Sequence, residues 1–154
     1  VWINDGTGRF EDSSQRLGDS NSRSIALGDL DGDGDLDAWV ANRPFESGNP
    51  ANHVWMNDGL GVFSRTDQSL GASESSSVAL GDFDRDGDLD AWVAERSGPN
   101  RVWINSGRGI FSETPLTPEG GTNTSVQVAD LDGDGDLDAM VGNYLGPNWV
   151  WIND

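Results

Sequence analysis

Apolar and polar residues alternate with a period of two in short runs along the chain. Residues 77–80, 89–94 and 102–105 are examples, and Gly, Asn and Asp are common between the runs. Successive side chains of a strand point to opposite faces of a sheet, so this period predicts short strands rather than helices. The sequence therefore predicts an all-β fold.

The strand pattern repeats at a nearly constant interval. Pairs of Val and Trp are spaced 53, 48 and 48 residues apart and begin at Val1, Val54, Val102 and Val150. Three windows rich in Asp keep the spacings of 53 and 48 and lie at residues 29–37, 82–90 and 130–138. Self-similarity at this interval is typical of repeat architectures. We call these segments the acidic windows.

The repeats divide one domain over residues 1–154 into units at 1–53, 54–101 and 102–149, followed by a strand at 150–154. The first unit is five residues longer, and the extra residues fall between Val40 and Val54. Pro and Gly in that stretch predict a surface loop.

Each unit contains four expected strands. The first enters an acidic window, the second leaves it, the third carries the motif VWIN or VWMN, and the fourth follows a turn such as NDGLG or NSGRG. Four-stranded antiparallel sheets at this spacing predict β-propeller blades. Along the chain we expect two strands of one blade, two complete blades and three strands of another. Large side chains predicted to pack between the blades are Trp2, Trp39, Trp55, Trp92, Trp103 and Trp151.

Charge and composition exclude several classes of partner and of metal site. The formal net charge of −18 is expected to repel nucleic acids and anionic lipids. No run approaches the roughly 18 apolar residues of a membrane helix, and no signal peptide is visible. There is no Cys and one His, so a metal must be held by oxygen atoms. We expect His53 in a solvated loop, because Arg101 and Trp149 occupy the matching positions.

Fifteen of the 27 acidic residues lie in the three acidic windows. Ca²⁺ takes six to eight oxygen ligands, which carboxylates at alternate positions of a tight loop can supply. We predict side-chain ligands at positions 1, 3, 5 and 9, a backbone carbonyl at position 7, and a positive φ for Gly at position 6. About three Ca²⁺ per chain are expected, held by Asp29, Asp31, Asp33, Asp35, Asp37, Asp82, Asp84, Asp86, Asp88, Asp90, Asp130, Asp132, Asp134, Asp136 and Asp138.

An EF-hand is the competing interpretation of these windows. Its loop ends in a Glu at position 12 and lies between helices. In the three windows position 12 is Val40, Val93 or Val141, and each lies within an expected strand. The EF-hand interpretation therefore fails. At position 4 of the second window we expect Arg85 to point away from the ion and to weaken that site only modestly.

The pattern (A/V)-(L/V)-(G/A)-D-x-D-x-D-G-D-L-D-A-x-V, followed by VWxN and a Gly-rich turn, resembles the FG-GAP or VCBS repeats of bacterial surface proteins. It is also similar to the calcium-binding blades of the integrin α-subunit propeller. The resemblance covers essentially the whole chain and implies a propeller that binds Ca²⁺ at one rim through the Asp residues of the windows. The Phe-Gly pair that names the family is not at the start of the strand before each window.

These features predict a calcium-binding module with a structural, adhesion or protein-interaction role at the cell surface or outside the cell. One alternative is a lectin, for which Phe45, Tyr144 and Trp149 could stack on sugars. Another is a segment of a polysaccharide-degrading enzyme, although the twelve acidic residues outside the windows form no repeated constellation. About three blades are fewer than the four to eight of a typical propeller. We expect a homodimer to complete the ring, or a longer array.

Overall fold

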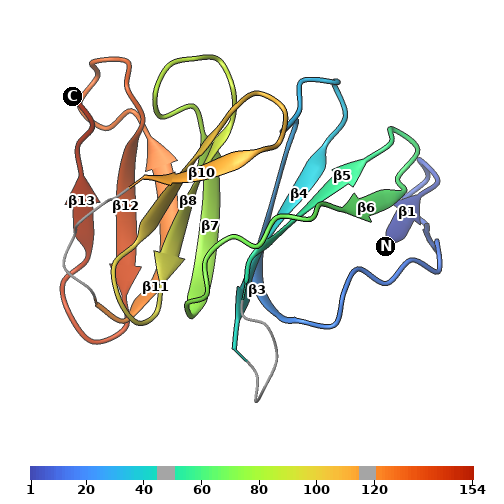
Figure 1. The fold of residues 1–154 in the computed structure, drawn as a ribbon, viewed down its shortest axis with the longest axis horizontal. Coiled ribbons are helices and arrows are strands. Elements are labelled where there is room, and N and C mark those ends of the chain that lie inside the picture. The colour runs from blue at the N-terminus through green and yellow to red at the C-terminus, as the bar shows by residue number, and fades with distance from the viewer. Residues whose placement is uncertain (45–50, 115–120) are drawn as a thin grey trace.

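The computed structural model describes residues 1–44, 51–114 and 121–154. Within these residues the chain forms strands and no helix, and the strands build four antiparallel sheets (Figure 1). The all-β prediction is confirmed. No helix long and apolar enough to cross a membrane occurs in the described ranges.

Each sheet follows the order of the sequence. The N-terminal hairpin comprises β1 (Trp2–Asn4) and β2 (Phe10–Asp12). The first blade comprises β3 (Asn21–Gly28), β4 (Asp37–Arg43), β5 (His53–Asn57) and β6 (Phe63–Arg65). The second blade comprises β7 (Ser75–Gly81), β8 (Asp90–Glu95), β9 (Arg101–Asn105) and β10 (Phe111–Thr114). The third blade comprises β11 (Asn123–Ala129), β12 (Asp138–Asn143) and β13 (Trp149–Trp151). This succession of two, four, four and three strands is the predicted one.

The first two strands of the three blades pair in the same way. Their last pairs are Gly28 with Asp37, Gly81 with Asp90, and Ala129 with Asp138. Position 9 of each acidic window is therefore the first residue of the second strand, and the preceding positions form the hairpin connection. At the other end of each pair the register shifts by one residue, which is a β-bulge in all three blades.

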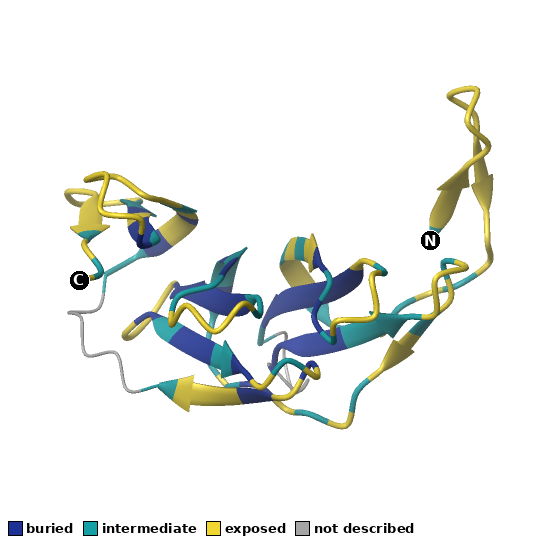
Figure 2. Cartoon of the chain, turned by 90° about the horizontal axis from the view of Figure 1, so that it is seen from above, coloured by how far each residue is buried: buried dark blue, intermediate teal, exposed yellow. Residues whose placement is uncertain are grey.

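The blades pack through their first strands, with β3 beside β7 and β7 beside β11. Buried residues lie where the sheets face each other (Figure 2). Trp39, Trp92 and Trp103 are buried there as predicted, and Trp55 and Trp151 are half-buried. The prediction is wrong for Trp2, which is 65% exposed. Its hairpin presents this side chain to solvent because it does not pack face to face against a blade (Figure 2).

His53 corrects another expectation. It begins strand β5, pairs with Val40 and is buried, so it does not lie in a solvated loop. Burial, together with the charge of Arg65, lowers its pKa. The matching residues Arg101 and Trp149 also begin third strands, so the position belongs to the sheet. Of the predicted surface insertion, residues 45–50 lie outside the described part of the chain.

Candidate metal centres

The three acidic windows lie at the same end of the blades, between the first and second strands (Figure 1). Position 1 organises each loop. In the first loop, Asp29 accepts hydrogen bonds from the amides of Gly32 (2.8 Å) and Gly34 (3.0 Å). Asp130 does the same in the third loop with Gly133 and Gly135. These bonds curl the backbone around one carboxylate.

Positions 3 and 5 continue this arrangement. Asp31 Oδ1 accepts the amide of Asp33 at 3.3 Å, and Asp33 Oδ1 accepts the amide of Asp35 at 2.9 Å. The second and third loops repeat both bonds. Short polar side chains stabilise turns in this way. One oxygen of each of these carboxylates therefore accepts a backbone amide.

Carboxylates of the acidic windows lie close together in space. Oxygen atoms lie within 4.8 Å of one another in four groups, which are Asp29, Asp31 and Asp33; Asp82, Asp84 and Asp86; Asp130, Asp132 and Asp138; and Asp132, Asp134 and Asp154. Position 3 belongs to every group. Ten of the fifteen predicted ligands are thus brought together, and Asp154 joins them although the sequence analysis did not propose it. The sequence feature that could have indicated Asp154 is the Asn-Asp pair that ends VWIND, because the same pair ends VWMND at Asp58.

Position 9 has a second role that sequence reasoning missed. The carboxylate of Asp37 is buried and accepts the amides of Leu30 (3.0 Å) and Asn57 (2.8 Å). Asp90 and Asp138 bind the equivalent amides of their own blades. This residue therefore ties its loop to the third strand. Burial raises the pKa of Asp90, although its two hydrogen bonds oppose the rise.

Position 7 directs its side chain away from the groups. Asp35 Oδ2 lies 2.3 Å from where a Cβ on Gly59 would be, and Asp88 Oδ2 lies 2.2 Å from the equivalent point on Gly107. Both glycines also have a positive φ, which strains other residues, so these turns favour Gly. Asp136, the third residue at position 7, contacts the guanidinium of Arg85. The backbone carbonyl at position 7 stays the predicted ligand.

Two positions of each loop adopt a left-handed backbone. Gly34, Gly87 and Gly135 at position 6 have φ values of 93°, 96° and 97°, which confirms the prediction. Position 4 is left-handed as well, with Gly in two loops and Arg85 at φ 63° in the second. Arg85 pairs with the third loop, so its side chain points away from its own loop as expected.

The Asn of the third strand connects neighbouring blades. Asn105 of the second blade donates to the carbonyl of Leu30 in the first loop at 2.8 Å. Asn153 of the third blade donates to the carbonyl of Phe83 in the second loop at 3.1 Å. The motif VWxN thus links the first and second loops to the next blade along the chain, and its repetition was the signal for this role.

The electrostatics of the loops favour a cation. Burial and the charges of the neighbouring carboxylates raise the pKa of Asp31, chief among them Asp33. Asp82 Oδ1 is buried and has no hydrogen-bond partner, unlike the same atom of Asp29 and Asp130. Buried polar atoms normally have a partner. The Asp clusters could hold a metal ion, and their all-oxygen donor set suits a hard divalent cation.

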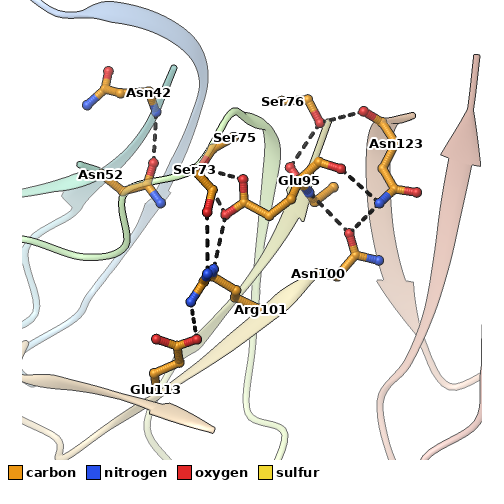
Figure 3. A network of polar contacts seen from close by, with 11 residues as sticks. Asn42, Asn52, Ser73, Ser75, Ser76, Glu95, Asn100, Arg101, Glu113 and Asn123 are labelled. Carbon is orange, nitrogen blue, oxygen red and sulfur yellow. Dashed lines mark hydrogen bonds and ion pairs between the residues drawn. The ribbon is translucent and has the colours of Figure 1, made fainter. Parts of the chain in front are cut away.

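A second group of titratable residues lies at the opposite end of the second blade (Figure 3). Glu95 is fully buried at the end of β8, where Asn42 and Asn143 stand in the other blades. It accepts hydrogen bonds from Ser75, and its Oε1 lies 3.6 Å from Nε of Arg101. Arg101 also contacts Glu113. Burial raises the pKa of Glu95 to about 7.

A model of the FG-GAP-like repeat family matches the chain three times, over residues 1–40, 40–93 and 82–141. Every match contains at least one acidic window and the strand before it. No curated protein matches the chain.

Proposed function

Because the chain belongs to the FG-GAP-like repeat family, we propose that it is a calcium-binding β-propeller module in which each acidic loop holds one structural Ca²⁺. The observation that carries the proposal is the repeated loop frame. Three loops share the same amide bonds to the carboxylates at positions 3 and 5, and each loop brings carboxylate oxygens of three residues within 4.8 Å of one another. The predicted ligands are the Asp residues of the acidic windows, with Asp154 added.

The ion would act on the stability of the propeller. A bound divalent cation neutralises carboxylates that otherwise repel one another. A site filled at 100 times its Kd adds about 2.7 kcal/mol to the free energy of unfolding. Because Asp37 and its equivalents tie the loops to the third strands, this stabilisation reaches the whole blade. Extracellular calcium modules bind with a Kd of about 10⁻⁴–10⁻³ M, which suits a protein outside the cytosol.

Thermal unfolding with and without calcium tests the proposal. We expect a higher Tm in millimolar Ca²⁺ than in EDTA for the wild-type chain. As a matched control, a triple variant with Asp31→Ala, Asp84→Ala and Asp132→Ala should give the same Tm in both buffers. An equal Tm of the wild-type chain in both buffers would contradict a structural role for calcium.

We propose a binding role rather than catalysis for this module. Three of the acidic residues outside the windows take part in contacts of the fold. Asp12 pairs with Arg16, Glu113 contacts Arg101, and Asp58 accepts the amides of its own turn. Turnover of polysaccharides in the presence of calcium would show the enzyme alternative to be correct.

Glycan binding is the second candidate. Tyr144 and Trp149, which lie on either side of the connection between β12 and β13, are 68% and 38% exposed. Exposed aromatic rings support stacking on sugars, whereas most of the other Trp residues are buried or half-buried. Phe45 lies outside the described residues. A glycan array probed in calcium would separate this candidate from protein binding.

Self-association is the proposed way to complete the ring. In the second blade, Phe111 of β10 packs edge-on against Trp39 at 4.5 Å. At the equivalent place beside Trp92 and Trp151 there is a pocket of about 220 Å³. Phe10 of β2, which corresponds to Phe111, is 58% exposed. The hairpin of a second copy would supply the fourth strand of the third blade and place Phe10 in this pocket.

Light scattering tests the dimer. We expect about twice the chain mass of 16.5 kDa, and Phe10→Asp should reduce it to the mass of one chain. Leu60→Asp is the matched control, because Leu60 is 85% exposed in a turn. A folded wild-type monomer at micromolar concentration would contradict the dimer.

A further inference from the structure

A polar pocket of about 200 Å³ opens among the three blades, far from the acidic loops. Its lining includes Arg23, Arg43 and Arg96 together with hydroxyl residues Ser75, Ser76 and Thr124. Arg43 ends β4 and Arg96 follows β8, whereas the acidic loops precede these strands. A seven-residue strand separates the two ends by about 20 Å, so the pocket is distinct from the metal centres.

The bulges of the three blades build this pocket. The register shifts between Ser22 and Ser24, between Ser75 and Ser77, and between Asn123 and Ser125. The extra residues at these three points are Arg23, Ser76 and Thr124, and each of them lines the pocket. Bulges often redirect a side chain next to a functional site. Three equivalent bulges that converge on one pocket indicate a built site.

Polar contacts of Ser76 and Asn123, which both line the pocket, join two of its strands (Figure 3). The Ser76 hydroxyl lies 2.9 Å from the carbonyl oxygens of Ala94 and Asn123. Asn123 is buried and donates to the Glu95 carbonyl at 2.8 Å. These contacts fix β7 and β11 relative to each other at the pocket.

The arginines are unpaired although the chain carries a charge of −18. Arg23, Arg43 and Arg96 form no ion pair with any described residue, whereas Arg16, Arg85 and Arg101 each contact a carboxylate. Nε of Arg43 is buried and has no hydrogen-bond partner. Among the described residues that line the pocket, Glu74 carries the one carboxylate, against three arginines.

We propose that this pocket binds the carboxylate or phosphate group of a small ligand. A guanidinium matches either oxyanion through two parallel hydrogen bonds, and the Thr124 hydroxyl adds a further polar group. Sites for drug-sized molecules have volumes of about 300–1,000 Å³, so this smaller pocket suits one acidic ring or chain end. Binding here does not require calcium in the loops.

Calorimetric titration in saturating Ca²⁺ with glucuronate, glucose 6-phosphate and neutral glucose tests the site. We expect one or both anions to bind saturably and glucose not to bind, and the preferred anion identifies the group. Arg43→Gln and Arg96→Gln should each weaken binding about tenfold or more, because a hydrogen bond to a charged group contributes about 1.5–3 kcal/mol. The matched control Arg108→Gln changes an exposed arginine in the β9–β10 turn and should keep the affinity.

Asp31→Ala should also keep the affinity, which separates this pocket from the calcium loops. Tm values in calcium check that each variant is folded. The proposal is overturned if neither anion binds saturably, if glucose binds as well as the anions, or if Arg108→Gln weakens binding as much as Arg43→Gln.

Discussion

The two interfaces between blades differ in one strand. Between the first and second blades, Trp39 packs against Trp103 at 6.2 Å and against Phe111 at 4.5 Å. At the interface between the second and third blades, Trp92 packs against Phe83 of its own blade at 6.0 Å, and the pocket of about 220 Å³ lies beside it. The first interface has a fourth strand, β10, and the second has none among the described residues. The Phe of the fourth strand therefore fills the space between two blades.

A Gln side chain closes the interface that the Phe fills. Gln68 donates to the Gly109 carbonyl at 2.6 Å and accepts the amide of Phe111 at 2.8 Å. Gln15, in the segment between the N-terminal hairpin and the first blade, makes the same two bonds with Gly61 and Phe63. The segment between two blades thus clamps the fourth strand of the next blade. The first interface has both the aromatic ring and this clamp.

The largest loss in the free energy of unfolding should come from removing the central Trp of each interface. Trp39→Ala should lower the free energy of unfolding by about 3–5 kcal/mol, because Trp39 is fully buried among aromatic rings. Trp92→Ala should cost less, because Trp92 already borders a pocket. Urea unfolding in saturating Ca²⁺ measures both values. An equal or larger cost for Trp92→Ala would remove the distinction between the interfaces.

A smaller effect on the free energy of unfolding should come from the ionisation of Glu95 at the end of β8. Glu95 has a raised pKa of about 7 when folded, against a reference value of 4.5. The folded chain therefore binds more protons between these values, so its stability falls as pH rises from 4.5 to about 7. Arg101 favours the charged form, whereas Glu113 and Glu74 oppose it.

The Gln side chain of Glu95→Gln carries no titratable proton. In this variant the free energy of unfolding should therefore fall by about 1–3 kcal/mol less over the same pH range. Urea unfolding between pH 5 and 8 in calcium measures the slope, and Glu11→Gln, in the exposed hairpin, is the matched control. A slope that is the same in Glu95→Gln and in the wild-type chain would show that Glu95 does not titrate in this range.

The smallest effect should come from the clamp. Gln68→Ala removes two hydrogen bonds across the interface and should cost about 1–2 kcal/mol. Gln127→Ala is the control, because Gln127 bonds only to the carbonyl of its neighbour Val126. Thermal unfolding in calcium compares the two variants. A cost for Gln68→Ala no greater than that of the control would show that the clamp adds no stability.

Much of the fold could be predicted because local patterns decide it. A period of two specifies strands, and repeated turns specify their order, so the sheets of two, four, four and three strands follow from the sequence. The acidic loops were found for the same reason, since Gly34 and its neighbours show the turn directly. Strands, turns and loops that depend on residues of one blade alone can be predicted from the sequence of one repeat.

Features that join blades were not predicted, because their partners lie far apart along the chain. The Asn of the third strand was read only as part of a repeated motif, yet Asn105 donates to Leu30 of the first blade, 75 residues away. Gln68 bonds to residues more than forty positions away. The repeated pattern Gln-x-Leu-Gly at 15–18 and 68–71 was a usable signal. Burial of His53 and Glu95 had no such signal, because each occurs in one repeat only.

The most direct test of the central claim is the number of calcium ions bound per chain, measured by equilibrium dialysis. The wild-type chain should bind about three. Asp31→Ala, Asp84→Ala and Asp132→Ala should each lose one ion, because position 3 belongs to every group of carboxylates. Asp67→Ala, which changes an exposed acid outside the windows, should lose none. Unchanged stoichiometry in the three loop variants, or no calcium bound by the wild-type chain, would contradict the account.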